Sequence, residues 1–296
     1  MLMSFAPLIA KIARRLPPVH WRVWWIQRRL RQFFAPRYIG RPDDWTVIND
    51  YDGNLKLKLR RSTYLGSVIE WHGYHSSNGL RLLERLLAPD MTFIDIGANS
   101  GAFSLFVAKR LPKGRVFAFE PIPHLFALLR ENIALNHFDH MQAYNLALSD
   151  QPGHITMYTS SDSAIHAGVN EGLASLFPGQ YRSEVAAEVE VSTLDTVLAS
   201  VPRIDMIKID VEGAELHVLR GGTSLIQKHK PILMLELNRE ALNAAGTSSE
   251  AVLAELTALG YRCERIANDV HGTPMPLDRG QIPDLCDILC RQESPR

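Results

Sequence analysis

Short apolar runs alternate with longer amphipathic segments over most of the chain. The runs "FIDIG", "RVFAFEP", "QAYNLALSD", "IDMIKIDVEG" and "PILMLELN" have the length and composition of buried strands. Between and after them, "PHLFALLRENIALN" and "TSSEAVLAELTALG" have helical spacing, and Thr247 with Glu250 forms a capping box for the second of these helices. This alternation predicts an α/β fold with a doubly wound, mostly parallel sheet that helices cover on both faces.

The pattern differs upstream of the first apolar run. In "WTVINDYDGNLKLKLRR", alternating apolar residues flank Asp52 and Gly53, a dipeptide that tolerates positive φ, so the segment predicts a β-hairpin. "NGLRLLERLLA", residues 78–88, predicts a helix that leads into the first strand of the sheet.

We therefore divide the chain into three parts: a basic amphipathic segment (1–44), a hairpin and helix cap (45–90) and a ligand-binding domain (91–296). Within the last part, residues 153–190 are polar and interrupt the strand-helix rhythm. Long loops in compact domains are usually functional or disordered, so we interpret this stretch as an insertion that covers the substrate. "YRCERI" and "DLCDILCR" predict two short final strands.

The charges of the chain balance overall but are unevenly placed. Lys plus Arg and Asp plus Glu number 32 each, which gives no general preference for nucleic acid. Residues 1–41, however, contain Lys11, eight arginines and no acidic residue. "WRVWWIQRRLRQFF" interleaves aromatic residues with arginine. It indicates either a helix that packs its aromatic face on the main domain or one that docks on a membrane surface or an acidic partner.

The sequence also bears on the compartment. No apolar run reaches the roughly 18 residues of a spanning helix. The three cysteines, Cys263, Cys286 and Cys290, are odd in number and form no C-x-x-C pair, which favours buried thiols in a reducing compartment. We expect a cytoplasmic protein, with peripheral membrane contact through residues 1–41 as the open alternative.

The glycine-rich turn in "FIDIGANSGAFSLFVAK" is a candidate ligand site. Ligands of parallel sheets bind at the carboxyl ends of the strands, where Gly97 and Gly101 let the backbone approach closely. Asn99 or Ser100 is placed to cap the following helix. Glu120 ends the next strand, where a carboxylate can accept hydrogen bonds from both ribose hydroxyls, so the pattern predicts a nucleoside-containing cofactor.

The spacing of this turn discriminates between cofactors. A dinucleotide site would have G-x-G-x-x-G and no acid against the pyrophosphate, whereas here Asp95 precedes a G-x-x-x-G turn. A carboxylate favours a cationic ligand, and S-adenosylmethionine carries an ammonium and a sulfonium but no phosphate. A nicotinamide-dependent oxidoreductase is the alternative that this argument disfavours.

An ordered set of motifs then resembles a known family. "FIDIGANSGAFSLFVAK", "VFAFEPIPHLFALLRENIALN", "NLALSD", "VSTLDTVL" and "IDMIKIDVEGAELHVLRGG" are similar, in that order, to the motifs of FkbM-type S-adenosylmethionine-dependent methyltransferases. The resemblance implies a class I methyltransferase (Rossmann-like) fold, with seven strands and an antiparallel last strand. It also implies O-methylation of a hydroxyl on a sugar-containing or other secondary-metabolite acceptor.

The resemblance also implies the cofactor contacts. Its motifs assign the methionine end of S-adenosylmethionine to Asp95, Gly97, Asn99 and Gly101, the ribose to Glu120, and the adenine to Ser149 and Asp150. The sequence departs from the family in "GYHSS", where His75 stands in place of a common acid.

Methyl transfer to a hydroxyl needs a group that removes the proton. Asp210, at the carboxyl end of the fourth strand, is our first choice as base; its alternative role is to cap the next helix or hold the turn at Gly213. Glu212 would bind substrate or face solvent, and Glu236 would shape the cavity floor or orient the acceptor. Candidate histidine bases in the insertion are His154 and His166.

The expected partners follow from these assignments. Asp205, Asp210, Glu212 and Glu215 give no defined ligand geometry, so we predict no metal. The acceptor would be a small molecule or glycan hydroxyl, and no nucleic acid is expected because the domain is neutral. A catalytically silent membrane or nucleic-acid adaptor that acts through its arginine-rich segment is a third hypothesis.

Overall fold

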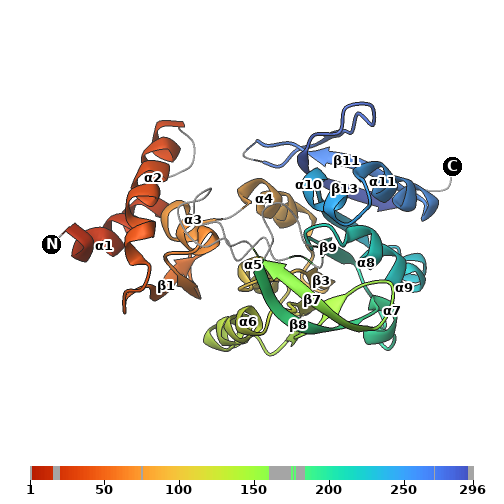
Figure 1. The fold of residues 1–296 in the computed structure, drawn as a ribbon, viewed down its shortest axis with the longest axis horizontal. Coiled ribbons are helices and arrows are strands. Elements are labelled where there is room, and N and C mark those ends of the chain that lie inside the picture. Colours follow the sequence, from red (N-terminus) through yellow and green to blue (C-terminus); the bar gives the residue numbers. More distant parts are fainter. Residues whose placement is uncertain are drawn as a thin grey trace.

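The computed structural model describes residues 2–15, 21–74, 76–159, 175, 177, 184–269 and 271–292. They form an eight-stranded sheet, a three-stranded sheet, a two-stranded hairpin and the helices around them (Figure 1). His75, His166 and the middle of the 153–190 insertion lie outside the described residues.

The eight-stranded sheet has the order β12-β11-β13-β10-β9-β3-β4-β5. Its parallel strands are β10 (Ile232–Asn238), β9 (Met206–Ile209), β3 (Thr92–Ile96), β4 (Arg115–Phe119) and β5 (Met141–Tyr144). The last strand, β13 (Leu285–Gln292), is antiparallel to both neighbours, β10 and β11 (Tyr261–Ile266). The predicted mixed sheet is confirmed, with one strand more than the seven expected, because β12 (Pro274–Pro276) pairs with β11.

Helices cover both faces of this sheet, and successive side chains of one strand enter different cores. Phe93 packs with residues of α4 (Ser77–Leu86) and α5 (Ala102–Arg110), whereas Ile94 packs with residues of α8 (Glu215–Gly221) and α11 (Ser249–Ala258). The other helices near the sheet are α6 (Pro123–Asn136), α7 (Leu194–Val197), α9 (Thr223–His229) and α10 (Arg239–Ala244). Burial on both faces explains why the strands are continuous apolar runs.

The predicted hairpin consists of β1 (Trp45–Tyr51) and β2 (Leu55–Arg60). Asp52 and Gly53 have φ angles of 44° and 89°, as the turn requires. Asn132 of α6 binds β2 through its side chain: its Oδ1 accepts from the backbone N of Lys58 at 2.7 Å, and its Nδ2 donates to the carbonyl oxygens of Lys58 (3.1 Å) and Ser100 (2.8 Å). These bonds satisfy the outer edge of β2 and tie the hairpin to the turn after β3.

The basic segment forms a helical layer at one end of the molecule. α1 (Leu2–Arg15) and α2 (Trp21–Phe34), followed by the 3-10 helix η1 (Ala35–Tyr38), pack on α3 (Tyr64–His72) (Figure 1). Ala6, Ala10 and Ala13 line the inner face of α1, in one buried cluster with Phe34 and Trp71. α1 therefore presents small residues to the rest of the chain, whereas α2 contributes the ring of Phe34.

The chain from residue 142 to residue 190 differs from two expectations. β6 (Ala147–Leu148), β7 (Gly153–Thr159) and β8 (Glu184–Ser192) form a separate sheet in the order β6-β8-β7. "QAYNLALSD" is thus not one strand, because the chain leaves the central sheet after Tyr144. Both ends of the insertion are strands rather than loop, since one face of this ribbon packs on Ile122 and Leu125 and the other carries polar residues.

Two smaller predictions were also wrong. Ser248, rather than Thr247, is the N-cap of α11 and accepts from the backbone N of Ala251 at 3.2 Å. Cys263 and Cys290, expected as free thiols, occupy paired positions of β11 and β13 and form a disulfide, because antiparallel pairing brings their Cα atoms to 4.1 Å. Among the described residues, we find no helix whose length and apolar character would let it span a bilayer.

Candidate active site

A cavity of about 640 Å³ opens at the carboxyl ends of β3, β4, β9 and β10. From β3 the chain continues to β4 and β5 on one side, whereas β9 leads to β10 on the other. The cavity therefore lies at the switch point where ligands of open parallel sheets bind. Its volume suits a nucleoside-sized cofactor together with a small acceptor.

The turn after β3 needs its glycines for close packing. Gly97 has φ of 84°, and a Cβ there would lie 1.9 Å from the carbonyl oxygen of Asp210. At Gly101, φ is 85° and a Cβ would lie 2.5 Å from Leu129. The expected side-chain cap is corrected: Gly101 itself is the N-cap of α5, and Asn99 Oδ1 accepts from the backbone N of Ser100. Gly97 and Asn99 line the cavity.

Glu120 is buried at the end of β4 and lines the same cavity. Its two carboxylate oxygens accept from the backbone N of Asn99 at 2.8 Å and of Ile122 at 2.9 Å. Burial raises the pKa of Glu120 to about 7, although these two hydrogen bonds favour the charged form. A carboxylate has about four acceptor sites, so Glu120 can still accept from ribose hydroxyls.

Lys208 connects two of the predicted acids. Its Nζ lies 3.4 Å from Asp95 Oδ1 and 3.1 Å from Asp210 Oδ2. Burial lowers the pKa of Lys208, but the two carboxylates outweigh it and hold the pKa above its usual range. Asp95 is fully buried and also accepts from Ser104 Oγ, so it faces Lys208 and α5 beneath the cavity wall rather than a ligand.

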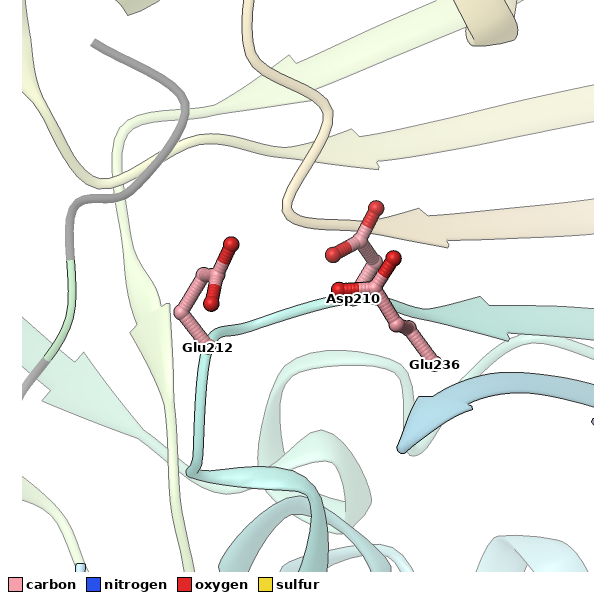
Figure 2. A group of neighbouring side chains, drawn as sticks. All are labelled: Asp210, Glu212 and Glu236. Atoms are coloured by element: carbon pink, nitrogen blue, oxygen red, sulfur yellow. The ribbon is translucent and has the colours of Figure 1, made fainter. Parts of the chain in front are cut away.

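Three acids gather on the other side of the cavity. Figure 2 shows Asp210 after β9, Glu236 in β10 and Glu212 in the loop that follows Asp210. Each of them can place a carboxylate oxygen within 4.8 Å of the others, and all three line the cavity. Oxygens so close can orient a hydroxyl, take up its proton or hold a divalent cation.

The environments of these acids differ. Burial, followed by repulsion from Asp210, Glu212 and Asp287, raises the pKa of Glu236 well above its usual range. Glu212 has φ of 51°, and its Oε2 accepts from Asn238 Nδ2 at 3.1 Å. Glu236 is therefore suited to donate a hydrogen bond at neutral pH, whereas Asp210 forms an ion pair with Lys208.

Glu215 holds the turn that Asp210 was a candidate to hold. It is buried at the start of α8, and its carboxylate accepts from the backbone N of Val211 and Gly213. Burial raises its pKa to about 7. Asp210 is thereby left to face Lys208 and the cavity.

Four other predicted residues lie away from the described cavity lining. Gly101 packs against Leu129, as above. Ser149 and Asp150 directly follow β6. Ser149 Oγ donates to the carboxylate of Asp150, which lies 3.3 Å from Nδ1 of His217 in α8. His154 is exposed near the start of β7.

Sequence reasoning missed three charged residues of the cavity, Lys208, Arg265 and Asp287. Lys208 belongs to the quoted run "IDMIKIDVEG", where a lone cation within an apolar strand was the available signal. Asp287 lines the cavity because β13 places it opposite Glu236, and burial with the nearby Asp210 charge raises its pKa to about 6. Only the pairing of β10 with β13 identifies Asp287.

The strand order, the antiparallel β13 and the cavity at the switch point together define a class I methyltransferase fold. Comparison with known proteins then gives the family. The family described as "Methyltransferase FkbM domain" matches residues 95–263, more than half of the chain. The chain belongs to the FkbM methyltransferase family.

Three relatives illustrate the similarity. "Methyltransferase 1" of Beauveria bassiana is 34% identical over 151 residues, covering 45% of this chain and 59% of that protein. The 2-O-methyltransferase NoeI of Sinorhizobium fredii is 30% identical, covering 50% of this chain and 64% of that protein. The 31-O-demethyl-FK506 methyltransferase FkbM of Streptomyces tacrolimicus is 32% identical, with 46% and 60% covered. The chain thus spans less than two-thirds of the length of each.

Proposed function

We propose that this protein is an S-adenosylmethionine-dependent O-methyltransferase whose acceptor is a hydroxyl of a sugar-containing or secondary-metabolite small molecule. The observation that carries the proposal is one cavity with two different ends. Glu120 and the backbone at Gly97 and Asn99 lie at the β3-β4 end, and the acids Asp210 and Glu236 lie at the β9-β10 end. Two of the relatives are named for O-methyl transfer or an O-demethyl substrate, which supports oxygen as the acceptor.

The cofactor half accounts for binding. Glu120 would accept hydrogen bonds from the ribose hydroxyls, and the exposed backbone of the turn would approach the methionine end. S-adenosylmethionine would supply an electrophilic methyl group on its sulfonium. The Asp210 carboxylate at the far end would favour that positive charge, whereas it would repel the pyrophosphate of a dinucleotide.

The acceptor half accounts for the proton. Glu236, held protonated by its surroundings, would donate a hydrogen bond that orients the acceptor, and Glu212 would line the acceptor site. During methyl transfer, the hydroxyl proton of the acceptor would pass to the carboxylate of Asp210. Positioning of the two substrates in this cavity would supply roughly 7–11 kcal/mol of the rate enhancement.

Isothermal calorimetry tests the cofactor assignment. We expect S-adenosylmethionine and S-adenosylhomocysteine to bind and NAD not to bind. Glu120→Gln should weaken binding about tenfold or more, because the neutral amide accepts weaker hydrogen bonds from ribose. Since the pKa of Glu120 is about 7, wild-type affinity should fall between pH 8 and pH 6 as the carboxylate is protonated.

The matched control is Glu131→Gln, which changes an exposed carboxylate on α6. NAD binding would favour the oxidoreductase alternative, and unchanged affinity in Glu120→Gln would remove the ribose role.

Metal independence stays a prediction. Methyl transfer should survive dialysis against EDTA, and a loss of activity that Mg²⁺ restores would contradict it.

A further inference from the structure

The outer face of the N-terminal layer is apolar and basic at the same time. On α1, the exposed apolar side chains are Phe5, Leu8 and Ile12, spaced three and four residues apart, and Leu8 is 57% exposed. They lie opposite the alanines that bury α1 against the rest of the chain. One helix therefore has two apolar faces, of which only the inner one is covered by the described residues.

α2 repeats this arrangement with aromatic residues. Trp24, Trp25 and Phe33 are exposed, Trp25 by 50%. The guanidinium groups of Arg28 and Arg29 lie 5.4 Å and 5.1 Å from the ring centroids of Trp24 and Trp25, respectively. Pairs of indole and guanidinium expose an amphipathic surface, with an apolar body and a charged tip, that is typical of the interface between lipid and water.

The positive charge of this surface indicates a negatively charged partner. Residues 1–41 contain no acidic residue, and among the basic side chains Lys11, Arg28, Arg29 and Arg37 are exposed. Arg14 instead serves the inner face, where it binds Asp50 at 2.6 Å. Exposed cations beside large apolar side chains match an anionic lipid surface, which offers phosphate at the depth of the arginines and hydrocarbon below it.

The layer also contacts the wall of the cavity. α1 and α2 pack on α3, whose first residues, Tyr64 and Leu65, line the cavity. Arg31 of α2 lies over the ring of Tyr64 at 5.1 Å. α3 thus lies between the cavity and any surface that α1 and α2 would bind.

We propose that α1 and α2 dock this protein on the surface of an anionic phospholipid bilayer, through the exposed apolar and arginine side chains just described. The helices lie in the interface and do not cross the bilayer. This inference stands apart from the proposed methyl transfer, because it rests on a different surface.

Co-sedimentation with vesicles tests the proposal on the full chain. Binding is expected to vesicles of phosphatidylcholine mixed with phosphatidylglycerol, with a blue shift of tryptophan fluorescence, and to be much weaker with phosphatidylcholine alone. Neutralising two cations in Arg28→Gln/Arg29→Gln should weaken binding about 30-fold, from about 1 kcal/mol per cationic side chain. Leu8→Ser/Trp25→Ser should weaken it at least about tenfold by removing inserted apolar area.

The matched controls remove positive charge or an exposed apolar side chain outside the N-terminal layer. Lys113→Gln/Arg115→Gln neutralises two exposed cations at the start of β4, and Val185→Ser removes an exposed apolar side chain of β8. Both should bind vesicles like the wild type, and circular dichroism checks the fold of every variant. Equal losses in the controls, or no binding to either vesicle, would overturn the proposal. A dimer in light scattering that Leu8→Ser/Trp25→Ser dissociates would assign the surface to a second copy instead.

Discussion

Lys208 gives the acids near the cavity different electrostatic environments. Its ammonium lies between Asp95 and Asp210, so these two carboxylates share a buried cation. Glu236 and Asp287 lie across from each other on β10 and β13 at a greater distance from that charge, and burial raises the pKa of both. One cavity thereby contains a paired carboxylate and protonatable carboxyl groups, a division of roles that acid-base catalysis uses.

The base assignment can be tested with one substitution. Asp210→Asn keeps the shape but removes the proton acceptor, so we expect methyl transfer to fall about 100-fold or more while the dissociation constant of S-adenosylmethionine changes little. Single-turnover kinetics and calorimetry measure the two effects separately. Asp139→Asn, at an exposed turn, is the control; near-normal turnover in Asp210→Asn would exclude Asp210 as the base.

At the scale of elements, side chains of α6 add to the strand pairing that holds the hairpin. A two-stranded hairpin is marginal in water, and β2 gains its outer hydrogen bonds from asparagine side chains. Asn132 also reaches the carbonyl oxygen of Ser100 in the glycine-rich turn. The same side chain thus positions the hairpin and the cofactor turn.

Asn132→Ala should lower the free energy of unfolding by roughly 3 kcal/mol, because it leaves two partly buried backbone groups of Lys58 and the buried carbonyl oxygen of Ser100 without partners. Urea denaturation measures this as a lower midpoint at constant slope. Asn136→Ala is the comparison: it removes the equivalent bonds to Lys56 at a more exposed position and should cost about 1 kcal/mol. Equal losses in the two variants would contradict the role given to Asn132.

For the whole molecule, buried carboxyl groups link stability to pH. The folded pKa values of Glu120 and Glu215 are about 7, above the ordinary 4.5, and that of Glu236 is raised further. Between the unfolded pKa of 4.5 and the raised folded pKa of each group, the folded state holds more protons than the unfolded state. The free energy of unfolding therefore falls as the pH rises through this range. The buried His72 acts in the opposite sense, because its pKa is lowered from 6.5 to about 4, but its effect is complete by pH 6.5.

Above pH 6.5 the acids dominate, so the ligand-free protein should lose stability between pH 6.5 and pH 8.5. Over this window Glu120 and Glu215 should each contribute roughly 0.8 kcal/mol, because most of the effect of a folded pKa near 7 falls below pH 6.5. Thermal denaturation across this range measures the change, and Glu215→Gln should show a shallower slope because one of these groups no longer titrates. A melting temperature that is flat or rises over this window would contradict the burial of these groups as acids.

Local patterns in the sequence determined the strands and helices of the sheet, the hairpin turn and the glycine-rich turn with Glu120, because each depends on neighbouring residues and on the period of burial. Local patterns could not determine which distant strands and side chains pair with one another. The antiparallel insertion of β13, which brings Asp287 opposite Glu236 and Cys263 to Cys290, is a contact between distant segments. The same holds for Lys208 between two acids and for the strand pairing inside the 153–190 insertion. Tertiary structure alone decided these, because side chains distant in sequence acquire their charge environment only when the sheet assembles.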